Sequence, residues 1–287
     1  MQELLGAFVN AILLGGLYAV IAVGMSMIFG IVKLVNLAHG DLMILGCYLS
    51  LTMSTHFGIH PLTSIVIVAP VMFVLGFALQ SLLFNRVLGR EMEPPLLVAF
   101  GLSIIIQNLL LAVYTPDAQS LTTTLSVTSL SLGENISVSM LYLINFLVGL
   151  LVIVGLQFFF RYTYLGRAIR GASDDSLAAA LVGVNTKNIY ALAMGIALIT
   201  AAVSGVLVGM TFTFYPYTGA TYLIIAFGVV IIGGLGSIKG TLVGGIILAM
   251  AQLMGAHFLG PGYQLLAGYA VLLAVLALRP EGIFKAG

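Results

Sequence analysis

Long apolar runs alternate with short polar or charged breaks along the whole chain. Nine such runs cover residues 4–32, 42–57, 62–85, 94–116, 136–160, 188–214, 217–238, 241–259 and 262–278. Because a helix needs about 20 residues to cross about 30 Å of hydrocarbon, this pattern predicts about eight or nine membrane segments. The run at 42–57 is short for a full crossing. The run at 4–32 is long enough to be tilted, broken or partly re-entrant.

Composition supports a membrane protein and excludes several other classes. Hydrophobic residues make up 61% of the 287 residues and charged residues only 7%, whereas soluble domains carry about a quarter. Runs such as LINFLVGLLVIVGLQFFF do not alternate as the strands of a membrane β-barrel do. A net charge of +1 argues against nucleic acid as a partner. We therefore expect an all-α polytopic membrane protein that forms a single domain over residues 1–287.

The distribution of basic residues predicts the orientation. Four of the ten fall in the loop at 161–187, and they are Arg161, Arg167, Arg170 and Lys187. Short cytoplasmic loops retain Lys and Arg, so we expect this loop and the C-terminus to be cytoplasmic. The segment 117–135, which is rich in Ser and Thr and lacks Lys and Arg, then lies in the periplasm. It is interpreted as an ordered loop or, alternatively, as a docking surface for a soluble partner. The side of the N-terminus stays open.

No motif for catalysis, a cofactor or a metal emerges. None of the four lysines follows a glycine, so the chain has no phosphate-binding loop, and no Gly-x-Ser-x-Gly elbow is present. His56 and His60 have a spacing that suits zinc, but Gly58 and Pro61 interrupt the helix and no third ligand is evident. The lone Cys47 is typical of a small buried hydrophobe.

The segment VNLAHGD places three polar side chains between two apolar runs. Its candidate functional residues are Asn36, His39, Gly40 and Asp41. Ionisable groups inside a membrane are costly and often functional, so a proton relay or a substrate contact is one interpretation. The other is a polar turn near the membrane surface, with Asp41 starting the next helix. A water channel is excluded because no Asn-Pro-Ala turn is present.

Glycines cluster in the segment IIGGLGSIKGTLVGG. The candidates for close helix packing or a hinge are Gly233, Gly234, Gly236, Gly240 and Gly244. The spacing misses the dinucleotide-binding fingerprint by one residue. If the segment is helical, residues 236, 240 and 244 share one face and allow another backbone to approach closely. Close packing is the first interpretation and a hinge the second. Lys239 is expected to mark the membrane edge.

The loop at 161–187 contains ASDDSLAAALVGVNTKN, in which Asp174 and Asp175 precede a short apolar helix that ends near Gly183. Acidic residues suit a helix N-terminus, and glycine suits the residue after its end. The helix is either a knob that fits a partner's groove or part of a loop that lies on the bilayer.

Two segments hint at an internal repeat. AHGDLMILG at 38–46 and IKGTLVGGI at 238–246 each combine a polar turn with a glycine-bearing helix. The predicted topology places both on the cytoplasmic side, which suits a parallel repeat. An inverted repeat would need an odd number of spans between them. The similarity is therefore accidental, or one of the nine spans is misassigned.

Four segments together resemble the permease subunits of bacterial ABC importers for branched-chain amino acids, a family that includes urea and amide importers. They are GLYAVIAVGMSMIFGIVKLVNLAHGD, RYTYLGRAIRGASDDSLAAALVGVNTKNI, AFGVVIIGGLGSIKGTLVGGIILA and RPEGIF. The resemblance implies a non-enzymatic inner-membrane subunit for Leu, Ile and Val. It would work with a second permease, two cytoplasmic ATPase subunits and a periplasmic binding protein. A urea or amide permease and a stand-alone transporter or channel are the alternatives.

The resemblance also implies roles for two segments. VNLAHGD would line or gate the substrate path. The loop helix would dock on the ATPase, although Leu177 stands where the family's Glu-Ala-Ala-x-x-x-Gly motif has its glutamate. The coupling loop assigned in this way includes Arg167, Arg170, Asp174, Asp175, Ala178, Ala179 and Gly183.

Overall fold

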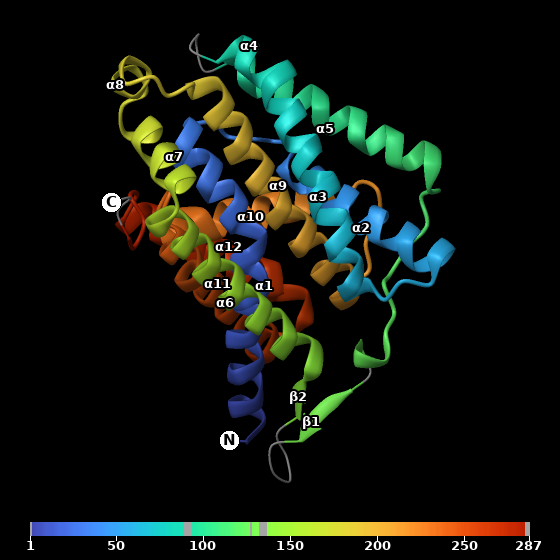
Figure 1. Cartoon of the computed structure of the whole chain (residues 1–287). Helices are drawn as coiled ribbons and strands as arrows, with labels where there is room; N and C mark the ends of the chain where they lie inside the picture. The colour runs from blue at the N-terminus through green and yellow to red at the C-terminus, as the bar shows by residue number, and fades with distance from the viewer. Residues whose placement is uncertain (1, 89–92, 127, 132–136, 285–287) are drawn as a thin grey trace.

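The computed structural model describes residues 2–88, 93–126, 128–131 and 137–284, and Figure 1 shows a bundle of helices that run side by side. The helices are α1 (Gln2–Val32), α2 (His39–Phe57), α3 (Pro61–Leu79), α4 (Asn85–Val87), α5 (Glu93–Val113), α6 (Met140–Tyr162), α7 (Tyr164–Asp174), α8 (Ser176–Leu181), α9 (Thr186–Thr211), α10 (Gly219–Gly233), α11 (Ile238–Leu259) and α12 (Gln264–Leu278). A π-helical turn, η1 (Gln80–Phe84), joins α3 to α4, and two short 3-10 turns are η2 (Thr124–Ser126) and η3 (Pro261–Tyr263). The strands are β1 (Ser129–Ser131) and β2 (Ser137–Ser139).

Each of the nine apolar runs forms a helix, which confirms the helical membrane fold. In the described part of the chain, seven helices are long and apolar enough to cross a membrane, and α10 is a shorter apolar helix. The first run is not broken, contrary to one of the expectations. It forms one continuous helix of 31 residues, about 46 Å long, which is longer than the hydrocarbon is thick.

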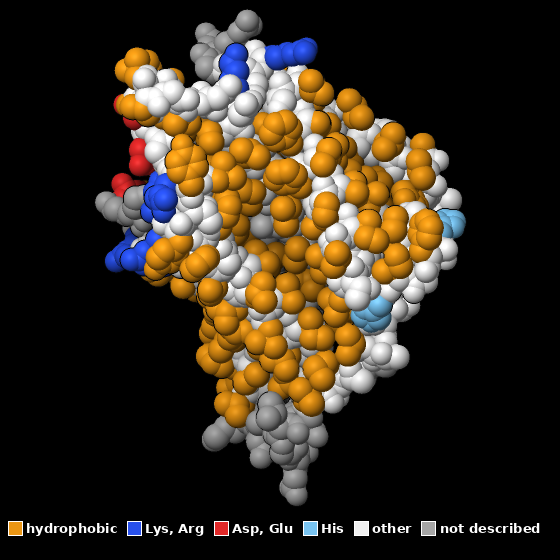
Figure 2. Space-filling view, viewed as in Figure 1, with side chains coloured by type: hydrophobic (Ala, Val, Ile, Leu, Met, Phe, Trp, Pro, Cys, Tyr) orange, Lys and Arg blue, Asp and Glu red, His pale blue; other side chains and the backbone are white. Residues whose placement is uncertain are grey.

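The bundle has an inner and an outer layer. Most of α1 and α9 is buried, whereas α5, α6 and α12 expose most of their apolar side chains. Figure 2 shows an apolar face on the side of the bundle where α5 and α6 lie. Inside, α1 packs along α11, and α9 packs along α3. A Cβ atom at Gly15 would lie 2.5 Å from the Cα of Ile246, so a small residue is needed where α1 crosses α11.

The two ends of the bundle differ in chemistry. At one end, called here the hairpin end, the start of α1 lies beside the antiparallel strands β1 and β2, in which Ser129 pairs with Ser139. Asn10 of α1 fixes β2, because its Nδ2 donates to the carbonyl of Ser137 (3.1 Å) and its Oδ1 accepts from the amide of Ser139 (3.3 Å). The all-helical expectation did not include these strands, of which β1 falls in the segment 117–135.

The opposite end, called here the basic end, carries α7, α8 and the C-terminus (Figure 1). The amides of Ile283 and Phe284 donate to the carbonyls of Ile232 and Gly233, at 3.0 and 3.2 Å, and hold the C-terminal segment against the end of α10. The predicted loop at 161–187 is largely helical, since α7 and α8 occupy most of it. The amphipathic α7 was not anticipated as a helix.

Two helices, α2 and α10, begin inside the bundle rather than at either end. The ring nitrogen Nε2 of His39, the first residue of α2, lies 2.9 Å from the carbonyl oxygen of Ile21. Ile21 lies 11 residues, or about 17 Å, before the end of α1 at Val32. The chain therefore folds back into the bundle through residues 33–38 before α2 begins. On the other side of the bundle, residues 212–218 lead inward to Gly219, where α10 begins.

From this shared starting region, α2 runs beside α9 toward the hairpin end, and α10 runs toward the basic end. The arrangement is an inverted one, in which α1, α2 and α3 correspond to α9, α10 and α11. The contacts reflect this, since α1 packs on α11 and α9 packs on α3. The predicted parallel repeat paired residues 38–46 with residues 238–246, so it made α2 the counterpart of α11. In the inverted arrangement the counterpart of α2 is α10, and the sequence similarity therefore pairs helices that do not correspond.

Candidate functional site

The polar segment before α2 makes a tight turn in the interior of the bundle. Asn36, His39 and Asp41 are each at most 3% exposed. The Asn36 side chain closes the turn, because its Oδ1 accepts a hydrogen bond from the amide of Ala38 at 3.1 Å. His39 reaches the carbonyl of Ile21 on α1, as described above. The turn therefore lies inside the bundle, and Asp41 lies in the first turn of α2, as expected.

The carboxylate of Asp41 is held by two side chains of α5. Ser103 Oγ donates to Asp41 Oδ2 at 2.5 Å, and Gln107 Nε2 donates to Asp41 Oδ1 at 3.0 Å. The carboxylate also lies at the start of α2 and against Gly219 at the start of α10. Helix N-termini carry partial positive charge, so two donors and two helix ends stabilise this buried carboxyl group in its ionised form.

Backbone contact joins the starts of α2 and α10. A Cβ atom at Gly40 would overlap the carbonyl oxygen of Gly219, and a Cβ atom at Gly219 would overlap the Asp41 carboxylate. Only glycine fits at either position without a shift of the backbone. We call the group formed by Asn36, His39, Gly40, Asp41 and Gly219 the half-helix junction.

Several members of this site were missed by sequence reasoning. Ser103 and Gln107 are separated from Asp41 by 62 and 66 residues, and nothing in their local sequence distinguishes them from other polar residues in membrane helices. Gly219 follows the break FYPYT, which was taken only as the boundary between two spans. Pro216 at that break was the available signal of a discontinuous helix.

The short helix expected before Gly183 is present as α8. Asp175 caps it, because its Oδ1 accepts from the amides of Leu177 and Ala178, both at 2.9 Å. Asp174 instead ends α7, so only one of the two aspartates caps α8. Gly183, with a φ of 88°, lies in the turn that follows α8. Ala179 is buried against the body of the protein and Ala178 is exposed.

Apolar side chains cover the exposed surface of α8. Leu177, Leu181 and Val182 are 74%, 83% and 79% exposed, and α8 projects from the basic end (Figure 1). The preceding α7 fixes its base, since Gly166 packs on the backbone of Phe159 and Ile169 is buried. Arg167 and Arg170 lie on the exposed face of α7.

The glycine cluster packs two helices closely and turns the chain between them. Gly233 and Gly240 lie so close that a Cβ atom on either would overlap the carbonyl oxygen of the other, and Gly244 contacts the carbonyl of Val229. Gly236 does not share the face of Gly240 and Gly244 as expected, because α11 begins only at Ile238. It adopts a φ of 81° in the turn and approaches α1. Gly234, with a φ of 102°, lies against the C-terminal segment.

The two histidines with zinc-like spacing lie on separate helices. His56 is in the last turn of α2, and His60 caps α3 by accepting from the amide of Leu62 at 3.3 Å. Within the described residues, no three His, Cys, Asp or Glu side chains gather in a way that could hold a metal ion.

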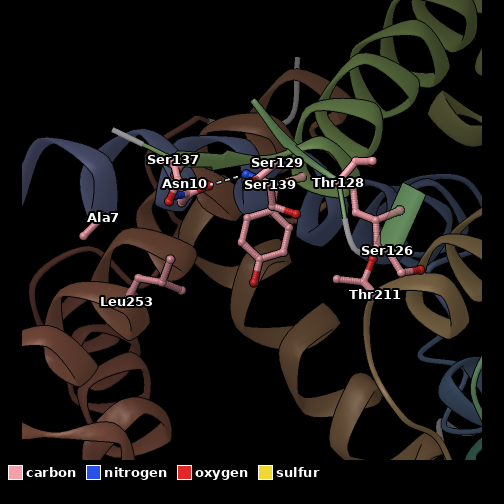
Figure 3. Close-up of a pocket in the computed structure, with 11 residues that line it drawn as sticks. Ala7, Asn10, Ser126, Thr128, Ser129, Ser137, Ser139, Thr211 and Leu253 are labelled. Atoms are coloured by element: carbon pink, nitrogen blue, oxygen red, sulfur yellow. Dashed lines mark hydrogen bonds between the residues drawn. The ribbon is translucent and has the colours of Figure 1, made fainter. Parts of the chain in front are cut away.

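At the hairpin end, hydroxyl groups line a cavity of about 540 Å³, shown in Figure 3. Its described lining consists of uncharged residues from α1, η2, the hairpin, α6, α9 and α11. The labelled side chains of Asn10, Ser137 and Ser139 lie together on one side of it, and Thr211 lies on the other.

Comparison with known proteins identifies the family. Residues 7–277 match the family described as branched-chain amino acid transport system, permease component. The chain belongs to this family. It is 31% identical to the high-affinity branched-chain amino acid transport permease BraD of Pseudomonas aeruginosa, over 96% of this chain and 94% of that protein. It is 30% identical to the corresponding LivH of Salmonella typhimurium, over 96% and 93% of the two chains.

A solved structure shares the fold. One chain of PsaBC from Streptococcus pneumoniae, solved in complex with Fab, superposes with a TM-score of 0.52 at 12% identity and covers 95% of this chain and 91% of that chain. Family membership and the long apolar helices make this protein an integral membrane permease component. Its curated relatives are permeases and not enzymes, which agrees with the expectation from the sequence.

Proposed function

We propose that the chain is the membrane-spanning subunit of an ATP-driven importer that carries leucine, isoleucine and valine across the bacterial inner membrane. The observation that carries this proposal is the family match over residues 7–277, together with relatives whose names specify branched-chain amino acids. The partners in this proposal are a second homologous permease, two cytoplasmic ATPase subunits and a periplasmic binding protein. The basic end faces the cytoplasm, because cytoplasmic loops retain Lys and Arg.

In this proposal α8 is the element that docks on an ATPase subunit. Three large apolar side chains are exposed at its surface, and a surface of this kind is typical of a protein contact. The Asp175 cap and the buried face of α7 make α8 a rigid projection. A movement of the ATPase subunit would therefore reach the membrane helices through α7, whose exposed Arg167 would lie beside the partner.

The half-helix junction is the proposed gate. Discontinuous helices in transporters place their N-termini near the middle of the membrane, where they form the substrate site. Here the junction is closed, since the backbones of Gly40 and Gly219 are in contact and Asp41 ties both helices to α5. Because most of α5 is exposed, it can move away from the junction more easily than the buried α1 or α9. Its movement would release Asp41 for the ammonium group of an amino acid.

Reconstitution tests the proposal. Liposomes that contain the chain with its partner permease and ATPase subunits are supplied with binding protein, and uptake of labelled leucine is measured with and without ATP. ATP-dependent uptake of leucine that is blocked by excess valine is the expected result. Preferential uptake of urea or a short amide would move the chain to the other branch of the family. Leucine flux through the chain alone without ATP would show a stand-alone transporter or channel instead.

A further inference from the structure

A second cavity, of about 730 Å³, opens at the basic end and concentrates positive charge. Four cations line it, and they come from separate parts of the chain: Lys33 after α1, Arg161 at the end of α6, Arg170 on α7 and Lys239 on α11. All four are exposed, and within the described residues none of them forms an ion pair with a carboxylate. Among the described lining residues the acidic one is Asp174, so the cavity has a net positive charge.

The lining also has an apolar part. Met27 and Ile31 of α1 and Phe160 of α6 contribute to it, and all three are buried at the ends of long apolar helices. The exposed Tyr162 and Tyr164 follow directly, and tyrosine is enriched where membrane helices reach the headgroup region. Cations beside an apolar wall at this depth match a molecule with an anionic head and a hydrocarbon tail.

Two backbone features favour an anion at the same place. Ser237, Ile238 and Lys239 line the cavity, so the N-terminus of a 22-residue helix lies beside the cations. Its N-cap Ser237 accepts from the amide of Gly240. Lys33 has a φ of 56°, a conformation that glycine usually takes after a helix, and its amide donates to the carbonyl of Phe29 at 3.0 Å. Such backbone outliers persist mainly where a site requires them.

We propose that this cavity binds the phosphate-bearing headgroup of an anionic phospholipid, with Lys33, Arg161, Arg170 and Lys239 around the phosphate. The acyl chains would lie beside the exposed apolar side chains of α6, such as Phe158. The bound lipid would bridge the end of α1, the base of α7 and the start of α11. These elements connect the half-helix junction to α8, so the lipid composition of the membrane would tune the coupling between the two sites.

The test uses the purified full-length chain in an uncharged detergent. Phosphatidylglycerol and phosphatidylcholine with the same acyl chains are titrated, and bound lipid is counted by native mass spectrometry while the thermal unfolding midpoint is recorded. We expect phosphatidylglycerol to bind at saturation and to raise the midpoint, and phosphatidylcholine to do neither. Equal effects of the two lipids would overturn the proposal.

Three variants locate the site. Lys33→Gly, Arg170→Gln and Lys239→Gln should each weaken phosphatidylglycerol binding by about fivefold, the effect expected for one cation near an anionic headgroup. Lys33→Gly also relieves the positive φ, so the lipid-free midpoint should not fall, and reduced binding in this variant cannot come from misfolding. Lys187→Gln, which removes a cation outside the cavity lining, is the matched control and should bind as the unaltered chain does.

Inorganic phosphate provides the last arm of the experiment. If phosphate alone raises the unfolding midpoint as much as phosphatidylglycerol does and displaces the bound lipid at an equal molar concentration, the site binds a free anion and the lipid proposal fails. If Lys187→Gln weakens binding as much as the three cavity variants do, the effect is nonspecific surface charge, and the proposal fails as well. Loss of binding in the cavity variants alone supports it.

Discussion

The half-helix junction and α8 both interrupt the apolar chain with polar residues, yet the junction is buried in the bundle and α8 is exposed at its basic end. At the junction, His39 and Asp41 are 2% exposed and bonded to α1 and α5, and glycine backbones are in contact. At α8, large apolar side chains are exposed and the helix is held by one cap and one buried alanine. The junction is thus a closed internal contact that must open for substrate to pass. The helix α8 is an external projection that must stay rigid to transmit movement.

The largest expected effect comes from adding one methyl group at the junction. Gly40→Ala would force a Cβ atom into the carbonyl of Gly219, and overpacking of this kind costs about 1–3 kcal/mol. We expect a lower thermal midpoint and loss of uptake, measured on the purified protein and in liposomes. Gly101→Ala is the matched control, because a Cβ atom there meets open space, and it should behave as the unaltered chain. Equal tolerance of both changes would mean that the junction is not closed as described.

Removing the imidazole at the junction should affect transport more than folding. His39→Ala deletes the hydrogen bond to Ile21, and a lost hydrogen bond of this kind costs about 1 kcal/mol. Uptake of leucine should fall well below that of the unaltered chain while membrane insertion continues. The measurement compares uptake per inserted molecule. If only the protein yield falls, the turn at 33–38 has a structural role and no part in the gate.

Charge reversal at α8 should break coupling and leave the membrane fold intact. Replacing Asp174 and Asp175 with lysine is expected to lower transport and the coupled ATPase activity, with normal insertion. The structure sharpens this prediction, because only Asp175 caps α8 and a lost cap costs about 1 kcal/mol. Asp175→Ala should therefore reduce coupling more than Asp174→Ala. Unchanged transport in the double lysine variant would refute the assignment of α8.

The smallest effect on folding is expected from the surface of α8. Leu181→Ser changes a side chain that is 83% exposed, so the free energy of unfolding should stay within about 0.5 kcal/mol. The amount of ATPase subunit that copurifies with the permease should nevertheless fall. Leu130→Ser, at the hairpin end, is the control and should leave copurification unchanged. Copurification that is insensitive to Leu181→Ser would show that the ATPase docks elsewhere.

The sequence predicted the apolar helices because apolar length is a local property, but it gave their number only approximately. It predicted eight or nine membrane segments, and the described residues form seven long apolar helices and the shorter α10. It also predicted a helix in front of Gly183 with an acidic cap, since capping depends on residues that are close in the chain. It did not show that α2 and α10 begin inside the bundle. Their depth depends on contacts such as His39 with Ile21, and hydropathy reports how apolar a run is and not where along the bundle it starts.

The partners of Asp41 were equally hidden, because Ser103 and Gln107 come to it from another helix. The inverted arrangement was missed for a related reason. It relates helices by their packing, and α2 and α10 share little beyond a glycine near the start. The sequence similarity between residues 38–46 and 238–246 instead paired α2 with α11, which packs on α1.

The most direct test of the account measures ATP hydrolysis and leucine uptake together in liposomes that contain the assembled importer. Asp41→Asn alters hydrogen bonds to a buried charge, each worth about 1.5–3 kcal/mol, and should lower uptake by about tenfold while hydrolysis stimulated by the binding protein continues. Leu181→Ser should lower both activities together. If the two variants lose hydrolysis and uptake in the same proportion, the junction and α8 do not have separate roles as gate and coupling element.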